Sequence, residues 1–183
     1  MDTLSDNALM LKVKNGDIDK MGLLYERYYR QLYRFIFNMT RQKELSEDMV
    51  QNIFLRMLKY PDGFMGFGEF KMWMYHIARN AVYDHFRKVK RTPYHSDVKE
   101  YEERIEGELY TDTPLMKEQE LKTLETAMQK LSDENRELLI LYRFQELKYN
   151  EIAKILNTTE GAIKVRVHRA LNQLKNNYLK IEN

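Results

Sequence analysis

The 183-residue sequence contains no cysteine, which excludes disulfide bonds, thiolate-bound metal ions and a cysteine nucleophile. It has only three prolines and seven glycines, so long helices are possible and a turn-rich β fold is disfavoured. No apolar run approaches the roughly 20 residues of a membrane-spanning helix. The first residues also lack the basic and then apolar pattern of a signal peptide. We therefore expect a helical, cytoplasmic protein with no membrane insertion.

Charge is abundant, and it is unevenly distributed along the chain. Residues 71–91 contain six Lys or Arg and one Asp, whereas residues 95–120 contain nine acidic residues and three basic ones. Residues 158–180 again carry five basic residues and one Glu. Two basic segments flanking an acidic one suggest two polyanion-binding modules and a connector, although solvated helix faces would give the same pattern.

The hydrophobic pattern predicts two small helical domains, and hence an all-α fold. Apolar residues at spacings of three and four predict a helix over 21–39, and Pro61 ends a second helix near Tyr60. A third helix is expected from about 69 to 91. Residues 93–114 are predicted to form an acidic linker, and helices resume over 115–183.

A helix-turn-helix is predicted near the C-terminus. Asn157 suits a tight left-handed turn, and Thr159 is placed to cap the helix that follows. One side of that helix is predicted to be buried, through Ile163, Val167, Ala170, Leu171 and Leu174. The opposite side carries Gly161, Lys164, Val165, His168 and Asn172. Small, basic and hydrogen-bonding groups near the start of such a helix suit the DNA major groove, although a plain helical hairpin would also have a solvated face.

The predicted helix at 69–91 also has two distinct sides. Phe70, Met74, Ile77 and Ala81 form an apolar side. A second stripe combines aromatic, amide and cationic groups, namely His76, Asn80, Tyr83, Arg87 and Lys90. Such a stripe suits phosphates and unstacked bases, although a solvated helix face is the simpler interpretation.

The loop that precedes this helix contains Phe64 among three glycines. Phe64 could fill a gap between two helices or stack on a base. We favour stacking, because glycines let the backbone approach a ligand and make a poor frame for a buried ring. The loop lacks the Lys-Ser/Thr of a phosphate-binding P-loop. Neither metal-ligand spacing nor a nucleophile elbow is present, so the sequence predicts no metal, no cofactor and no enzyme.

Together these segments resemble the extracytoplasmic-function (ECF) sigma factors of the sigma-70 family. The stretch SEDMVQNIFLR at 46–56 looks like the polymerase-binding helix of that family, and residues 64–80, which include FKMWMYHIARN at 70–80, look like its melting and downstream-element segment. The helix-turn-helix at 131–174 resembles its upstream-element domain. The resemblance implies an alternative sigma factor that binds core RNA polymerase and promoter DNA, recognises the −10 and −35 elements and promotes initiation. An anti-sigma factor is a further possible partner.

The resemblance also assigns residues to three surfaces. The polymerase-binding set is Asp48, Gln51, Asn52 and Leu55. The −10 set is Phe64, His76, Arg79, Asn80, Tyr83, Arg87 and Lys90. The −35 set is Thr159, Gly161, Lys164, Val165, His168 and Arg169. Glu146 departs from the family pattern, since a turn glycine is frequent at that position.

Two other classes of protein carry comparable features. A one-component or response-regulator transcription factor would have the same helix-turn-helix, but its other domain is usually α/β, and no strands are predicted in the N-terminal half. A helical adaptor that binds only proteins would leave both basic stripes unexplained.

Overall fold

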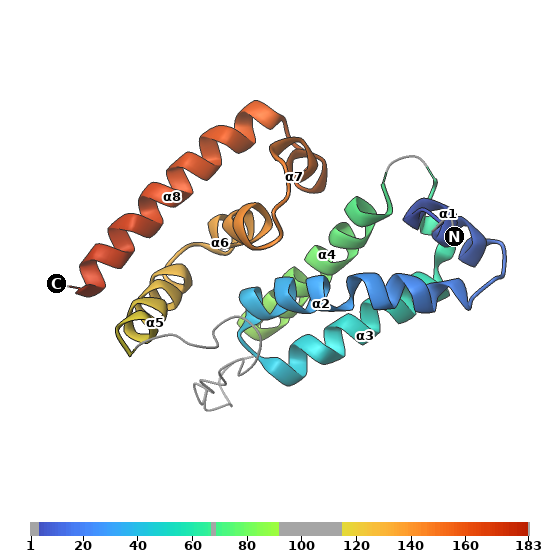
Figure 1. Cartoon of the computed structure of the whole chain (residues 1–183), viewed down its shortest axis with the longest axis horizontal. Coiled ribbons are helices and arrows are strands. Elements are labelled where there is room, and N and C mark those ends of the chain that lie inside the picture. Colours follow the sequence, from blue (N-terminus) through green and yellow to red (C-terminus); the bar gives the residue numbers. More distant parts are fainter. Residues whose placement is uncertain (1–3, 67–68, 92–114, 183) are drawn as a thin grey trace. The chain divides into compact units, whose positions relative to one another are not determined.

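The computed structural model describes residues 4–66, 69–91 and 115–182, and the linker predicted at 93–114 lies outside this range. The described helices divide into two compact units, one holding α1–α4 and the other α5–α8 (Figure 1). Every regular element in the described residues is helical. The predicted all-α fold with a C-terminal helix-turn-helix is therefore confirmed.

The first unit contains four α-helices and one 3₁₀ turn. They are α1 (Asp6–Lys14), α2 (Lys20–Thr40), α3 (Lys43–Lys59), η1 (Pro61–Gly63) and α4 (Phe70–Arg91). The Ser5 hydroxyl caps α1 by accepting from the backbone N of Ala8 at 3.2 Å. Helix α3 ends immediately before Tyr60 and Pro61, as the sequence predicts.

Helix α2 lies at the centre of this unit and packs against α1, α3 and α4. Leu24, Leu32 and Ile36 of α2 are fully buried, and Phe35 packs edge to face on Tyr75 of α4, with ring centroids 5.5 Å apart. Burying a side chain of this size contributes roughly 1.5–3 kcal/mol. The amphipathic pattern of α2 thus fixes where α3 and α4 lie.

The second unit contains α5 (Leu115–Gln129), α6 (Asp133–Leu139), a π-helical turn η2 (Ile140–Phe144), α7 (Tyr149–Ile155) and α8 (Glu160–Glu182). Helix α8 packs against α5, α6 and α7. The Ser132 hydroxyl caps α6 by accepting from the backbone N of Asn135 at 3.3 Å. The guanidinium of buried Arg136 donates to Gln129 and Asp133, which joins α6 to the end of α5.

The predicted core is wrong in part on both α8 and α4. Leu171, expected to be buried in α8, is 43% exposed and Leu174 is only half-buried, because the partner helices cover the stripe that contains Ile163, Val167 and Ala170. On α4, Ile77 and Ala81 are half-buried, while their neighbours Ala78 and Val82 are fully buried. The core face of α4 is therefore rotated by about one residue from the predicted one.

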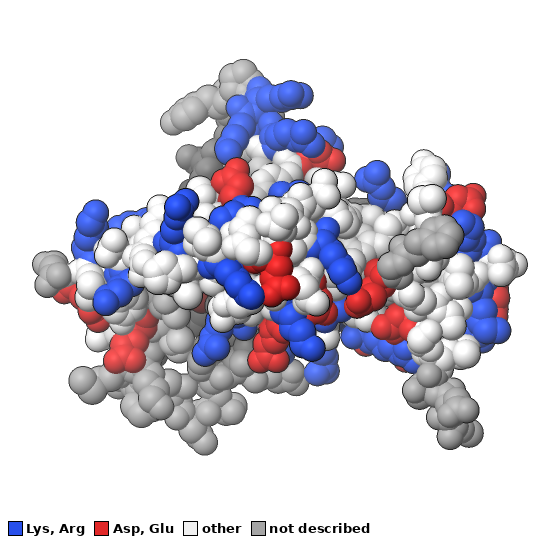
Figure 2. All heavy atoms as spheres, turned by 90° about the horizontal axis from the view of Figure 1, so that it is seen from above, with Lys and Arg blue, Asp and Glu red and all other residues white. Residues whose placement is uncertain are grey.

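Lys and Arg alternate with Asp and Glu over the face seen in Figure 2. This mixture follows from the amphipathic helices, which turn their charged sides to solvent. Among the described helices, none combines the length and the apolar character needed to cross a bilayer.

Candidate nucleic-acid interface

The turn between α7 and α8 has the geometry of a helix-turn-helix. Asn157 adopts the left-handed conformation with φ of 49°, as predicted. The Thr159 hydroxyl accepts from the backbone N of Ala162 at 3.2 Å and so caps α8, which confirms the predicted cap. The side of α8 that is predicted to face DNA is solvent-exposed at Gly161, Lys164, Val165, His168 and Arg169.

Lys164 and His168 on this side of α8 already have partners. The Lys164 ammonium lies 2.8 Å from a Glu160 carboxylate oxygen and 5.8 Å from the centroid of the Tyr149 ring. The His168 Nε2 lies 3.1 Å from the Asn172 amide nitrogen. Both members of the Lys164–Glu160 pair are about half exposed, so the pair is weak and a phosphate or base edge can replace the carboxylate.

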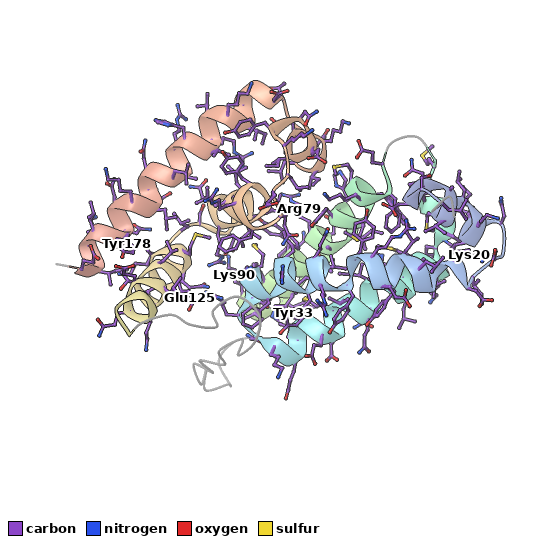
Figure 3. The ribbon with its side chains drawn as sticks, in the orientation of Figure 1. Lys20, Tyr33, Arg79, Lys90, Glu125 and Tyr178 are labelled. Atoms are coloured by element: carbon purple, nitrogen blue, oxygen red, sulfur yellow. The ribbon has the colours of Figure 1, made fainter. Side chains whose placement is uncertain are left out.

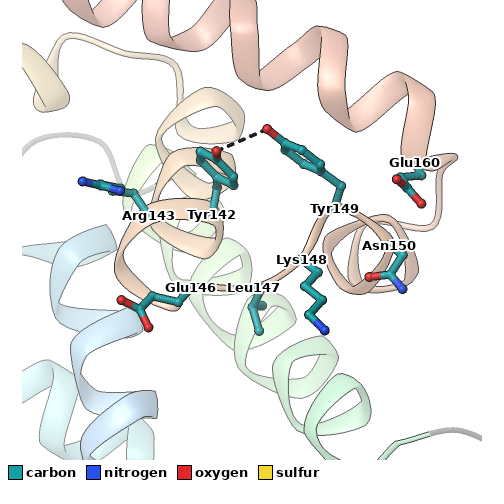
Figure 4. Close-up of a pocket in the computed structure, with 8 residues that line it drawn as sticks. All are labelled: Tyr142, Arg143, Glu146, Leu147, Lys148, Tyr149, Asn150 and Glu160. Carbon is teal, nitrogen blue, oxygen red and sulfur yellow. Dashed lines mark hydrogen bonds between the residues drawn. The ribbon is translucent and has the colours of Figure 1, made fainter.

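An open pocket of about 570 Å³ lies beside the helix-turn-helix, between η2 and α7 (Figure 4). The rings of Tyr142 and Tyr149 stack with centroids 5.2 Å apart, and the Tyr149 hydroxyl donates to that of Tyr142 at 3.2 Å. This hydrogen bond raises the pKa of Tyr149. Glu146, at the rim, adopts a φ of 52°. The stacked pair was not predicted from the sequence, where the two tyrosines are seven residues apart.

On α4 the predicted stripe is partly exposed and partly packed. Asn80, Arg87 and Lys90 are exposed, whereas His76, Arg79 and Tyr83 are half-buried; Figure 3 labels Arg79 and Lys90.

The Arg79 guanidinium lies 5.0 Å from the centroid of the Tyr83 ring. Arg87 forms an exposed ion pair with Asp84 one turn earlier. The stripe thus presents cations and an aromatic ring along one side of α4.

The expectation that Phe64 is an exposed stacking platform is wrong for this structure. Its side chain is 2% exposed, and its ring centroid lies 5.3 Å from Trp73 and 6.3 Å from Phe70. The glycines do not prevent burial, because residues 61–63 form a 3₁₀ turn in which Phe64 N donates to Pro61 O at 3.0 Å. A Cβ on Gly63 would lie 3.6 Å from the Trp73 ring, an ordinary van der Waals contact, so Gly63 packs beside the indole. Phe70 is fully buried, as predicted.

A second pocket, of about 550 Å³, lies beside the buried Phe64. Arg56, Tyr60, Gly63, Trp73 and Ile77 line it. Tyr60 is 57% exposed, and the Lys59 ammonium lies 5.4 Å from its ring centroid. The sequence reasoning missed this aromatic and cationic pocket, because its residues come from α3, η1 and α4 and only their packing brings them together.

Helix α3 presents the third candidate surface. Asp48, Gln51, Asn52 and Leu55 are all exposed, and the side chain of Leu55 is 60% exposed despite being apolar. The opposite side of the helix is buried through Val50, Ile53, Phe54 and Met57. The four candidate residues therefore share an accessible face with an apolar group at its end.

Titratable groups in the described part of the chain do not gather as they do in a metal centre. Within the described ranges, no three His, Asp or Glu side chains converge closely enough to hold a metal ion.

Comparison with known proteins identifies the family. The model for sigma-70 region 2 matches residues 24–92, and that for sigma-70 region 4 matches residues 121–174. RNA polymerase sigma factor YlaC of Bacillus subtilis is 31% identical over 170 residues, which cover 88% of this chain and 94% of YlaC. The ECF sigma factor SigM of the same organism is 32% identical over 83% of this chain and 91% of SigM.

Two solved structures share the fold. The sigma factor RpoE of Bartonella quintana, solved with the anti-sigma factor NepR, is 25% identical with a TM-score of 0.66, and the match covers 88% of this chain and 98% of RpoE. CnrH, solved with the cytosolic domain of CnrY, has a TM-score of 0.72 at 20% identity over 97% of this chain and 99% of CnrH. The chain belongs to the ECF group of the sigma-70 family. It is thus a transcription initiation factor and not an enzyme.

Proposed function

We propose that the chain brings core RNA polymerase to its promoters through three separate surfaces, and that it acts in the cytoplasm. In this proposal residues 1–92 bind the polymerase clamp and the −10 element. Residues 93–114 form an acidic connector, and residues 115–183 bind the −35 element. The main support is the capped start of α8, where Gly161, Lys164 and His168 are exposed opposite a buried side.

The −35 element is proposed to bind as duplex along α8. Lys164 and His168 reach base edges, while Thr159 and Arg169 contact the phosphate backbone. Gly161 allows close approach, since nothing lies within 4 Å of its Cβ position. Val165, 51% exposed, offers an apolar contact that suits a thymine methyl group.

The −10 element is proposed to bind along α4 as a melted strand. Arg79, Arg87 and Lys90 neutralise phosphates, and His76, Asn80 and Tyr83 contact bases. Because Phe64 is buried, an unstacked base would enter the neighbouring pocket and stack on Tyr60 or Trp73. Stacking on an aromatic side chain is worth about 1–3 kcal/mol per base, which offsets the few kcal/mol that unstacking costs.

Core polymerase is proposed to bind α3 through Asp48, Gln51, Asn52 and Leu55. Exposed Leu55 supplies the apolar contact and the three polar residues supply orientation. An anti-sigma factor is a second proposed partner, supported by the RpoE structure, in which a sigma factor is bound to NepR.

Reconstitution with core polymerase tests the whole proposal. The chain is mixed with core enzyme, the complex is isolated by gel filtration, and promoter sequences are selected from duplex DNA randomised at both elements. Co-elution with core and enrichment of two spaced motifs is the expected result. A chain that neither co-elutes nor changes the sequences selected by core enzyme would contradict the proposal.

A further inference from the structure

Helix α1 contacts the chain just after η1, at Phe64, and at the start of α4, at Phe70. The side-chain oxygen of Asn7 accepts a hydrogen bond from the backbone N of Phe70 at 2.7 Å. Lys14 is the last residue of α1, and its ammonium donates to the backbone oxygen of Phe64 at 3.2 Å. These bonds join residues that are 63 and 50 positions apart in the sequence.

Gly66, which follows Phe64 by two residues, also lies against α1. Gly66 adopts a φ of +74°, and a Cβ there would lie 3.4 Å from a methyl carbon of Leu11. Lys14 additionally lies 3.5 Å from a carboxylate oxygen of Asp62, but that carboxylate is 91% exposed and the ion pair is correspondingly weak. The hydrogen bonds to the backbone therefore define the positions of Phe64 and Phe70 more than the ion pair does.

The Asn7 contact has a specific consequence for α4. The first amides of a helix have no acceptor within the helix, so they need one from elsewhere. Asn7 supplies it to Phe70, the first residue of α4, and thereby fixes the start of that helix. The same start carries Trp73, which lines the pocket beside Phe64.

Helix α1 lies outside the part of the chain that the sigma-70 region 2 model matches, which begins at residue 24. It also carries none of the residues assigned to polymerase or DNA. We propose that α1 is a positioning element for −10 recognition, in which Asn7 and Lys14 hold the start of α4 and the backbone of Phe64 so that the pocket is preformed for an unstacked base. This inference rests on the proposed function of the α4 surface.

The test uses full-length chain in holoenzyme and a forked −10 DNA that the wild-type holoenzyme selects from a randomised pool. Asn7→Ala removes the acceptor for the backbone N of Phe70, and Lys14→Met removes the donor to Phe64 O together with the weak ion pair to Asp62. Loss of preorganisation is expected to weaken binding of the forked DNA by about three- to tenfold for either variant. Affinity for core polymerase should not change, because the α3 surface is separate from the contacts that are removed.

Three further variants make the test specific. Lys14→Arg and Asn7→Asp keep a donor and an acceptor in place and should restore forked-DNA binding. Lys12→Met makes the same substitution as Lys14→Met at an exposed position of the same helix and should have no effect. A purely structural role for α1 would reduce polymerase binding and −10 binding together, which would overturn the inference.

Asn80→Ala separates this inference from the proposed function. If Asn80→Ala weakens forked-DNA binding while Asn7→Ala and Lys14→Met do not, the α4 surface is correctly assigned and the role of α1 is wrong. If Asn80→Ala also binds forked DNA normally, the −10 assignment of α4 fails, and the proposed role of α1 fails with it.

Discussion

Truncation of Phe64 to Ala is expected to destabilise the first unit, while the protein that remains folded should still bind an unstacked base. The ring is 2% exposed and lies against Trp73 and Phe70, so its removal leaves a cavity between η1 and α4. Phe→Ala at a site this well packed costs about 3–5 kcal/mol. With a urea m-value of about 1–3 kcal/mol/M, the unfolding midpoint should fall by roughly 1 M or more.

The single tryptophan makes this measurement specific to one unit. Trp73 is the only Trp in the chain and its ring centroid lies 5.3 Å from that of Phe64, so indole fluorescence reports unfolding of the first unit alone. Phe64→Leu serves as the control, since a large aliphatic side chain refills most of the volume and should cost clearly less. Helix α8 and its neighbours should melt as in the wild type.

Tyr60→Ala is the matched functional variant. Tyr60 is 57% exposed, so its loss should cost little stability but weaken single-strand binding by about 1–3 kcal/mol. Open-complex formation on duplex and on pre-melted promoter would then be compared for the two variants. The reasoning is refuted if Phe64→Ala keeps the wild-type urea midpoint and loses single-strand binding, because Phe64 would then be the stacking residue.

Three other predictions concern separate surfaces. Gln51→Ala and Leu55→Asp should abolish core binding in gel filtration while circular dichroism stays unchanged; wild-type binding by either folded variant would show that the polymerase surface lies elsewhere. Lys164→Ala should alter base preference at particular −35 positions at a cost of roughly 1–3 kcal/mol, whereas Arg169→Ala should weaken all sequences alike and flatten the salt dependence; identical sequence preferences for the wild type and Lys164→Ala would remove the base-reading role. Glu146→Gly should stabilise the second unit by about 0.5–1 kcal/mol in thermal denaturation, because Glu146 has a φ of 52°; Glu146→Ala, which keeps the strain, should give no such gain.

Much of the fold could be predicted because local signals agree with tertiary packing. The caps at Ser5, Ser132 and Thr159 and the left-handed turn at Asn157 each depend on a few adjacent residues, and all four are present. Such features are decided within one turn of the backbone.

The errors arose where several elements meet. Phe64 is buried because a 3₁₀ turn folds its ring onto Trp73, which is nine residues further along the chain. The pocket lined by Arg56 and Tyr60 depends on the same packing. The contact of Asn7 with Phe70 spans 63 residues, and a single sequence contains no local sign of it. Periodicity identifies the faces of a helix, but it does not identify which neighbour covers them.

Both proposed DNA surfaces carry their own acidic partners, and this arrangement bears on specificity. On α4 Arg87 pairs with Asp84, and on α8 Lys164 pairs with Glu160. All four side chains are about half exposed or more, so each pair contributes only about 0–1 kcal/mol and yields readily to DNA. In the proposed complex the carboxylates would stay near the bound DNA and reduce sequence-independent attraction. On this proposal the affinity comes mainly from base contacts and from the second surface, and we expect stable binding to require both elements at once.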